Sequence, residues 1–306
     1  MSSIISCRLM GGLGNQLFQI FTTIAYAVKY KRKLILPYSE ELNTGKTRPT
    51  YWDTFLSGLI QFTTYNINSG YSTDTLYKLP TYNEPVFRYT EIPNFTNNEF
   101  SLYGYFQSYK YFEHTQADIL SYIKLYTQQE QIRNEYSTIL SDSTHNISMH
   151  FRIGDYKDEP DYFPIMPYIY YENALSTIMT DSLNDLKRDF ISSSSYKTKP
   201  IISYKVLYFC EREDNDVVNN IIVELRKRFP IIDFSKVDDT IVDWKQMLIM
   251  SCCQDNIIAN STFSWWGGYF NQNSQKRVFY PAIWFGSKLP HDATDLFPNS
   301  WKKISW

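Results

Sequence analysis

Apolar residues along this chain recur in short blocks that alternate between the spacing of a buried strand and that of an amphipathic helix. Residues 4–10 predict an opening strand, and residues 34–37 predict the next one. Between them, apolar residues at helical spacing are Leu17, Ile20, Phe21, Ile24 and Val28. A strand–helix–strand unit of this kind is a common start for an α/β domain with a parallel sheet.

The middle of the chain is less regular. Residues 43–99 show no convincing period, which predicts loops and short elements. Residues 101–112 begin as a strand, and we expect one helix to follow over 115–140. Polar residues gather at 141–146, so we expect two domains, 1–143 and 144–306.

Residues 147–152 alternate with a period of two, and the polar positions are Ser148, His150 and Arg152. Two interpretations are open. Arg152 at the strand's carboxyl end suits a diphosphate, because open α/β sheets bind ligands there and arginine makes charge-assisted contacts with phosphate. Alternatively, the segment is a half-exposed edge strand with a surface ion pair between Arg152 and Asp155.

The second half repeats the alternation of strand and helix. Residues 206–210 predict a strand that ends at Glu211, and residues 217–229 predict an amphipathic helix. Strands at 231–234, 257–259 and 277–281 follow, with a helix at 243–253 and another after 260. This order predicts an α/β fold with a parallel sheet and helices on both faces.

A glycine-rich turn at 11–16 opens the first helix and contains Gly12, Gly14, Asn15 and Gln16. It lacks the Lys-Ser/Thr pair of a P-loop, and its glycines do not follow the dinucleotide-binding spacing. Glycine serves tight turns in general. The turn therefore indicates either a plain connection or an open backbone beside two amide side chains.

The stretch 256–270 contains a second turn of interest. A short apolar strand stops at Asn260, and the hydroxyls of Ser261, Thr262 and Ser264 can cap the helix that follows. Backbone N–H groups at such a helix start suit an anion. The plain alternative is a helix cap followed by aromatic core, and we expect Trp265 and Trp266 to pack in that core.

Charge, cysteine spacing and hydropathy argue against several classes of protein. A net charge of −2 argues against a nucleic-acid-binding surface. The four cysteines lack the spacing of a zinc site or a disulfide framework. No apolar run is long enough to span a bilayer, and the first residues do not resemble a signal peptide, so we expect a location in the cytoplasm or peripheral to a membrane on its cytosolic side.

Several motifs occur together in one order along the chain. They are Gly-Gly-Leu-Gly-Asn-Gln-Leu-Phe-Gln at 11–19, Gly-Tyr-Phe-Gln-Ser at 104–108, His-x-Arg-x-Gly-Asp-Tyr at 150–156, Tyr-Tyr at 170–171, Asn-Ser-Thr-Phe-Ser-Trp-Trp at 260–266 and Pro-x-x-Trp-Phe at 281–285. With these motifs the chain resembles the α-1,2-fucosyltransferases, family 11 of the glycosyltransferases. The resemblance extends over most of the chain.

The resemblance implies a GT-B-like fold, in which two Rossmann-like domains have parallel sheets that face a cleft. Residues 1–143 would form the acceptor-side domain and residues 144–306 the GDP-sugar-binding domain. The implied reaction is transfer of L-fucose, with inversion, from GDP-β-L-fucose to the 2-hydroxyl of a galactose-containing glycan. The implied enzyme is a hexosyltransferase that needs no metal or other cofactor.

The resemblance also implies roles for individual residues. Arg152 takes the donor diphosphate and is the principal catalytic residue. His150, Asp155 and Glu211 are candidate bases for the acceptor hydroxyl by their own chemistry. The alternatives are that His150 braces the loop, that Asp155 orients Arg152 and that Glu211 binds the donor ribose or base. The expected donor-binding residues are Gly12, Gly14, Asn15, Gln16, Arg152, Glu211, Asn260, Ser261, Thr262, Phe263 and Ser264. One departure is Ile153, where the family usually has a second arginine, and Arg212 is a candidate replacement for that charge.

Other functions stay open at this point. The same fold could use another GDP-deoxysugar or another acceptor, or the chain could be a catalytically silent module that binds a nucleotide sugar or a glycan. A phosphotransferase is disfavoured, because neither a Walker lysine nor a magnesium-binding carboxylate pair is evident.

Overall fold

The computed structural model describes residues 3–43, 45–96, 98–141, 143–192 and 203–306. The chain forms two compact units. Unit 1 contains Met1–Glu130 and His291–Asn299, and unit 2 contains Gln131–Pro290 and Ser300–Trp306. Unit 2 begins at Gln131, whereas the sequence pattern predicted a domain boundary after residue 143. The segment 291–299 belongs to unit 1, which the pattern did not predict.

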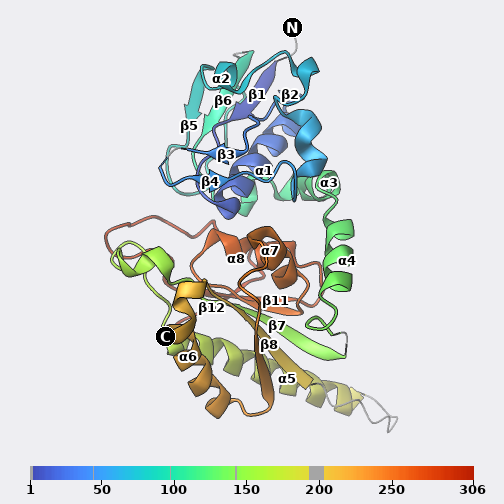
Figure 1. Cartoon of the computed structure of the whole chain (residues 1–306), viewed down its shortest axis with the longest axis vertical. Helices are drawn as coiled ribbons and strands as arrows, with labels where there is room; N and C mark the ends of the chain where they lie inside the picture. Colours follow the sequence, from blue (N-terminus) through green and yellow to red (C-terminus); the bar gives the residue numbers. More distant parts are fainter. Residues whose placement is uncertain (1–2, 44, 97, 142, 193–202) are drawn as a thin grey trace. The chain divides into compact units, whose positions relative to one another are not determined.

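Unit 1 is built on a parallel four-stranded sheet with the order β2-β1-β6-β5. Helix α1, Leu13–Lys29, packs on this sheet and buries most of its length (Figure 1). Strand β5 lies in the stretch without a clear period, so its place in the sheet is not evident from the pattern. The strands are β1 (Ile4–Cys7), β2 (Lys33–Leu34), β5 (Thr81–Asn83) and β6 (Glu99–Tyr103).

Short elements make up the rest of unit 1, as the irregular pattern predicts. The expectation of one helix over 115–140 is wrong, because Lys124 has a φ of 53°, in the left-handed region, and separates two helices. Helix α4 contains the change of unit. The elements are β3 (Glu41–Leu42), β4 (Arg48–Pro49), η1 (Ser57–Phe62), η2 (Ile67–Ser69), α2 (Thr73–Leu76), η3 (Tyr109–Tyr111), η4 (Glu113–Thr115), α3 (Gln116–Tyr122) and α4 (Leu125–Glu135).

Unit 2 is built on a parallel six-stranded sheet with the order β12-β11-β10-β7-β8-β9. Helices α5 and α6 lie on one side of it and α7 and α8 on the other (Figure 1). The strands are β7 (Thr144–His150), β8 (Ser203–Phe209), β9 (Ile232–Lys236), β10 (Asp255–Ile257), β11 (Arg277–Pro281) and β12 (Lys302–Ile304). The helical elements are η5 (Gly154–Lys157), α5 (Tyr168–Ser192), η6 (Arg212–Asp214), α6 (Asn215–Arg228), α7 (Asp243–Ser251) and α8 (Thr262–Phe270).

The expected α/β class is confirmed. Each unit has a parallel sheet covered by helices, and two Rossmann-like units in one chain are the GT-B-like fold that the resemblance implies. That the two sheets face a common cleft stays a prediction. In the part of the chain that the structure describes, no helix is both long enough and apolar enough to cross a membrane.

Strand β7 occupies a central position between β10 and β8, and its polar side chains Ser148 and His150 are buried. The alternative of a half-exposed edge strand is therefore wrong. The alternating pattern arises because the polar side of β7 faces other buried polar groups. For example, the Asn256 amide donates to the Ser148 hydroxyl over 2.7 Å.

A buried carboxylate ties three strands of unit 2 at their amino ends. Asp255 on β10 is 1% exposed and hydrogen bonds to His145 on β7 over 2.7 Å. It also accepts from the Arg277 guanidinium on β11 over 2.5 and 3.0 Å and from the Arg277 backbone N–H. Burial alone would raise the pKa of Asp255, but the hydrogen bonds from His145 and Arg277 outweigh it and lower that pKa.

We expect Asp255→Asn to destabilise the chain by about 3 kcal/mol at neutral pH, because it leaves Arg277 half-buried without its counter-charge. A carboxyl whose pKa is lowered by folding stabilises the fold above its unfolded pKa, and this contribution is lost as the pH falls through its folded pKa. The difference between wild type and variant should therefore shrink below the ordinary aspartate pKa of 3.8. Urea unfolding over a pH series measures both effects.

Asp161→Asn is the matched control, because Asp161 pairs with Lys288 at a position where both side chains are 59% exposed. Its effect should be small at every pH. Equal stability of wild type and Asp255→Asn at neutral pH would contradict the structural role of the buried carboxylate.

Candidate functional site

Arg152 lies two residues after the end of β7, at the carboxyl edge of the unit 2 sheet. Its guanidinium contacts the carboxylates of both Asp155 and Glu211. Glu211 comes shortly after β8, and β7 and β8 pair in parallel with His150 opposite Phe209, so the residues that follow the two strands meet at one edge. The Arg152 side chain is 19% exposed, whereas its two partners are about half exposed. The cation is thus held from two sides and still reaches the surface.

Tyr156 connects Arg152 with the end of β10. Its ring centroid lies 4.9 Å from the Arg152 guanidinium carbon, and its hydroxyl donates to the Asn260 carbonyl over 3.1 Å. The ring of Phe163 stacks on it at 4.9 Å. Tyr156 belongs to the sequence motif, but the sequence alone assigned it no role.

Asp214 is fully buried and fixes the turn that carries Asp155 and Tyr156. It accepts from the Gly154 backbone N–H over 2.8 Å and from the Lys157 ammonium over 2.5 Å. Sequence reasoning missed Asp214. It follows Glu211 within a polar run of four residues, and a pattern does not reveal which acid of such a run turns inward.

Position 154 requires glycine. Its φ of +32° is unfavourable for side chains, and a Cβ placed there would lie 3.0 Å from the Glu211 carboxylate. A larger residue would therefore move Glu211 away from Arg152.

His150 lies beside this cluster in a neutral state. Burial, with the charge of Arg152, lowers the pKa of His150 to about 3. Its ring centroid is 5.6 Å from that of Phe263, and its Nδ1 is buried without a hydrogen-bond partner in the described part of the chain. Such an imidazole is a weak base, and its Nδ1 can hydrogen bond to water or to a ligand.

The second turn has the predicted helix cap. The Ser261 hydroxyl is the N-cap of α8 and accepts from the Phe263 backbone N–H over 3.3 Å. Thr262 is the first residue of the helix, and the buried Ser264 hydroxyl donates to the Ser261 carbonyl over 3.3 Å. The anion-suited helix start therefore lies at the same edge of the sheet as Arg152.

Asn260 braces this turn from inside. Its amide donates to the carbonyls of Pro164 and Trp284 over 2.9 and 3.2 Å. Trp265 and Trp266 are both fully buried, which confirms the prediction that they pack in the core.

The glycine turn of unit 1 forms the start of α1. Gly11 has a φ of +78°, and Gly12 is the N-cap, where an added Cβ would meet no atom within 4 Å. Gly14 is buried in the first turn of the helix. Gln16 is also fully buried, and its amide donates to the carbonyls of Gly11 and Pro49 over 3.0 and 2.9 Å. Gln16 thus stabilises the turn by hydrogen bonding to its backbone.

Asn15 joins this turn to the motif at 104–108. The Gln107 amide donates to the Asn15 side-chain oxygen over 3.1 Å. The 104–108 loop is held by Glu84, whose carboxylate accepts from the backbone N–H groups of Tyr105 and Phe106 over 2.8 and 3.0 Å. Two motifs far apart in sequence therefore meet at the carboxyl edge of the unit 1 sheet.

The predicted site residues thus form one set in each unit. Arg152, Asp155 and Glu211 meet at the carboxyl edge of the unit 2 sheet, and Tyr156 links them to the turn after β10. The set in unit 1 is Gly12, Gly14, Asn15 and Gln16. Their binding of a donor stays a prediction.

Ile153, where the chain departs from the motif, is buried, and Arg212, the candidate replacement for the missing charge, is exposed. Ile153 is 3% exposed and packs in the apolar core of unit 2, so an arginine at this position would place its charge in that core. Arg212 is 72% exposed and forms an ion pair with Asp239. Its compensation for the missing arginine stays a prediction.

Known proteins resemble the chain in sequence. Residues 231–304 match the model of glycosyl transferase family 11. The O-antigen biosynthesis glycosyltransferase WbnK of Escherichia coli is 27% identical over 210 residues, which are 67% of this chain and 60% of that protein. The α-1,2-colitosyltransferase of Escherichia coli is 23% identical over 314 residues, with 99% of each chain covered.

A solved structure of an Arabidopsis thaliana FUT1 mutant in complex with GDP covers 92% of this chain and 70% of its own, with 10% identity and a TM-score of 0.47. The family match and the two curated proteins confirm the resemblance that the motifs indicate: the chain is similar to the family 11 glycosyltransferases.

Proposed function

We propose that the chain is an inverting α-1,2-fucosyltransferase that moves L-fucose from GDP-β-L-fucose to the 2-hydroxyl of a galactose-type acceptor. The observation that carries this proposal is Arg152, a partly exposed cation at the carboxyl edge of the unit 2 sheet. Its connection through Tyr156 to the turn before α8 adds a helix start suited to phosphate. The family 11 resemblance supports the choice of sugar and linkage.

In the proposed reaction the acceptor oxygen attacks the anomeric carbon of fucose from the face opposite the diphosphate. The bond between that carbon and the phosphate oxygen breaks, and its electron pair stays on the leaving GDP. Arg152 stabilises the charge that develops there, the role that a divalent metal has in metal-dependent transferases. Removal of one such preorganised donor typically lowers kcat by about 10²–10³-fold.

The cations of this edge are already paired before any donor binds. Arg152 contacts Asp155 and Glu211, and Lys157 contacts Asp214. Two carboxylates beside Arg152 repel a diphosphate, so we propose that one of them gives up its contact with Arg152 when the donor binds. We propose that Glu211 moves, because Asp155 belongs to the short turn that Asp214 holds in place.

None of the three candidate bases is assigned. The lowered pKa of His150 makes it a weak proton acceptor. Asp155 stays paired with Arg152, and Glu211 is proposed to turn away from Arg152 when the donor binds. In the proposed mechanism the acceptor proton passes to a water molecule as the glycosidic bond forms, and leaving-group stabilisation supplies the main rate increase.

A second candidate keeps the fold and linkage but changes the sugar. The relative that spans 99% of the chain is named as an α-1,2-colitosyltransferase, which favours colitose as the alternative. A transfer assay with both activated sugars distinguishes the two candidates.

We expect the chain to transfer fucose from GDP-fucose to at least one member of a panel of galactose-terminated acceptors, and linkage analysis should show an α-1,2 bond. Arg152→Ala should lower kcat by at least about 10²-fold with the fold retained. Arg228→Ala is the matched control, because it removes another arginine of unit 2 that pairs with a carboxylate, Glu172. Full activity of Arg152→Ala would exclude the proposed role.

We expect Glu211→Gln to bind GDP about fivefold more tightly at neutral pH, because it removes a competitor for Arg152 and a charge that repels the diphosphate. Burial raises the pKa of Glu211, although Arg152 acts in the opposite direction. Because its pKa is raised, Glu211 takes up a proton earlier on acidification than an ordinary glutamate, so wild-type affinity should approach that of the variant as the pH falls. Calorimetric titration with GDP over a pH series measures this.

Glu224→Gln is the control for that comparison, since Glu224 is an exposed carboxylate of unit 2 paired with Lys227. Weaker GDP binding by Glu211→Gln would mean that Glu211 contacts the nucleotide itself, for example through ribose hydroxyls.

We expect Asp214→Ala to raise the KM for the donor and to lower kcat, because the turn that carries Asp155 and Tyr156 loses its buried anchor. Asp214→Asn should recover much of this activity, since its side-chain oxygen still accepts from the Gly154 N–H. Steady-state kinetics of both variants, with thermal melting, separates positioning from loss of fold. Equal defects in the two variants would contradict the positioning role.

A further inference from the structure

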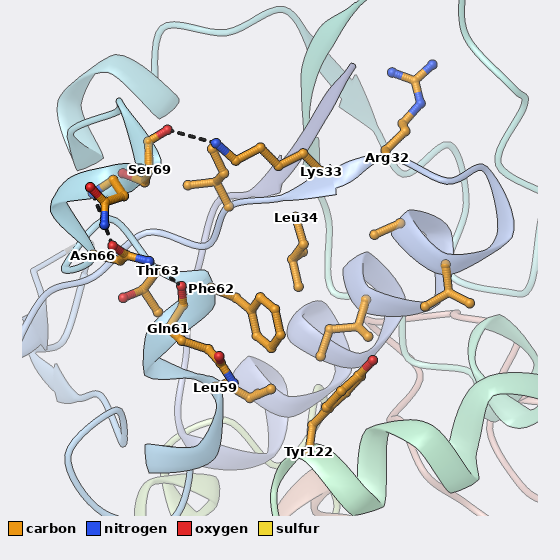
Figure 2. A pocket seen from close by; sticks show the side chains of 15 residues that line it. Arg32, Lys33, Leu34, Leu59, Gln61, Phe62, Thr63, Asn66, Ser69 and Tyr122 are labelled. Carbon is orange, nitrogen blue, oxygen red and sulfur yellow. Dashed lines mark hydrogen bonds between the residues drawn. The ribbon is translucent and has the colours of Figure 1, made fainter. Parts of the chain in front are cut away.

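A pocket of about 420 Å³ in unit 1 has no part in the proposed transfer reaction. It lies beside the last turns of α1 and the edge strand β2, at the opposite end of α1 from the glycine turn (Figure 2). Gly14 and Val28 lie about 20 Å apart along that helix, given its rise per residue. The volume is in the range of small-molecule sites. The pocket is therefore large enough to hold a small molecule, and it is distant from the glycine turn.

The backbone explains why the pocket exists. Strand β2 ends at Leu34, and the chain pairs again at Leu36, whose N–H donates to the Phe62 carbonyl over 2.8 Å and whose carbonyl accepts from Thr64 over 2.9 Å. A further hydrogen bond joins β2 to η2, where the Lys33 ammonium donates to the Ser69 carbonyl over 3.1 Å. Lining residues of the pocket lie between these two connections, Leu34 and Ile35 on one wall and Asn66 and Asn68 on the other.

The pocket has an apolar half and a polar half. Figure 2 shows Leu34, Leu59, Phe62 and Tyr122 on the mainly apolar side, where the Gln61 amide lies beside Leu59, with Thr63, Asn66, Ser69 and the end of Lys33 on the polar side. The rings of Phe62 and Tyr122 meet edge to face at 5.6 Å. A ligand that fills both halves must be amphiphilic.

The charged residues that line the pocket, Arg32 and Lys33, are both basic. Among the described residues that line the pocket, none is Asp or Glu. Arg32 points away from the pocket in Figure 2, and its guanidinium donates to the Phe95 carbonyl. Lys33 is exposed, and within the described ranges its ammonium has no carboxylate partner. With three donors and one carbonyl partner, Lys33 can still bind an anionic group.

Apolar side chains are unusually exposed around this pocket. Ile67, between the lining residues Asn66 and Asn68, is 94% exposed, and the adjacent Tyr65 is 62% exposed. The lining residues Val28 and Tyr122 are 46% and 41% exposed. Single exposed apolar residues are common on proteins, but a group beside an amphiphilic pocket marks an interaction surface.

We propose that this face of unit 1 docks on a membrane that contains anionic phospholipid. One acyl chain enters the apolar half of the pocket, the lipid phosphate binds Lys33, and Ile67 and Tyr65 enter the interface. Tyrosine suits the boundary between lipid and water, and basic side chains are attracted to anionic head groups. A soluble sugar or nucleotide would leave the apolar half of the pocket uncovered. This inference does not depend on the proposed transferase activity.

The test is co-sedimentation of the full chain with vesicles of phosphatidylcholine alone or mixed with phosphatidylglycerol. We expect binding to the mixed vesicles that is at least severalfold stronger than binding to phosphatidylcholine. Lys33→Glu should weaken it by about tenfold, because one basic residue near an anionic surface contributes about fivefold and the substitution also adds a repulsive charge. Ile67→Asp should weaken it to a similar extent.

The chain offers matched controls in unit 2. Ile231 is a 74% exposed isoleucine, and Lys303 is an exposed lysine, so Ile231→Asp and Lys303→Glu repeat the same chemistry away from the pocket. Both should bind the mixed vesicles like wild type. Thermal melting of all four variants shows whether each is folded, and the exposed positions of Lys33 and Ile67 make loss of fold unexpected.

A second arm uses decyl phosphate as a soluble anionic amphiphile with a single chain. Competition by decyl phosphate for vesicle binding supports occupation of the pocket by a lipid chain. Binding of decyl phosphate without any vesicle binding would overturn the membrane proposal in favour of a soluble amphiphile. Absence of vesicle binding by the wild type, or equal losses in pocket and control variants, would also overturn it.

Discussion

The pairing of Arg152 with Asp155 and Glu211 is the interaction on which the proposed chemistry depends. Its geometry follows from the register between two parallel strands, because β7 and β8 must end at the same level for these side chains to meet. A slip of one residue would turn Arg152 to the other face of the sheet. The buried Asp214 then fixes the turn after β7.

The two edges of the unit 2 sheet use charge pairs for different purposes. At the amino edge, Asp255 is almost fully buried and bonded to Arg277 and His145, so its removal costs stability. At the carboxyl edge, Arg152 is partly exposed and its carboxylate partners more so. Such pairs contribute little to stability and can exchange partners at low cost. The charge pairs at the amino edge therefore stabilise the fold, and those at the carboxyl edge belong to the proposed donor site.

Much of this structure could be predicted from the sequence. Periodicity indicated the alternation of strands and helices, and the positions of Arg152 and the Ser261 cap followed from where strands end. Features set by tertiary contacts were not visible: the inward turn of Asp214, the left-handed Lys124 that divides the predicted helix, and the short strand Thr81–Asn83. Asp214 and the short strand depend on partners distant in sequence, which a local pattern does not contain, and nothing in the residue type of Lys124 indicates its left-handed backbone.

The central claim is that Arg152 exchanges a carboxylate for the donor diphosphate. A crystal structure of the chain with GDP tests it most directly. We expect the Arg152 guanidinium to hydrogen bond to a β-phosphate oxygen and Glu211 to have turned away, while Asp155 and the turn bound by Asp214 keep their positions. An Arg152 that still contacts both carboxylates, with the GDP diphosphate bound elsewhere, would contradict it.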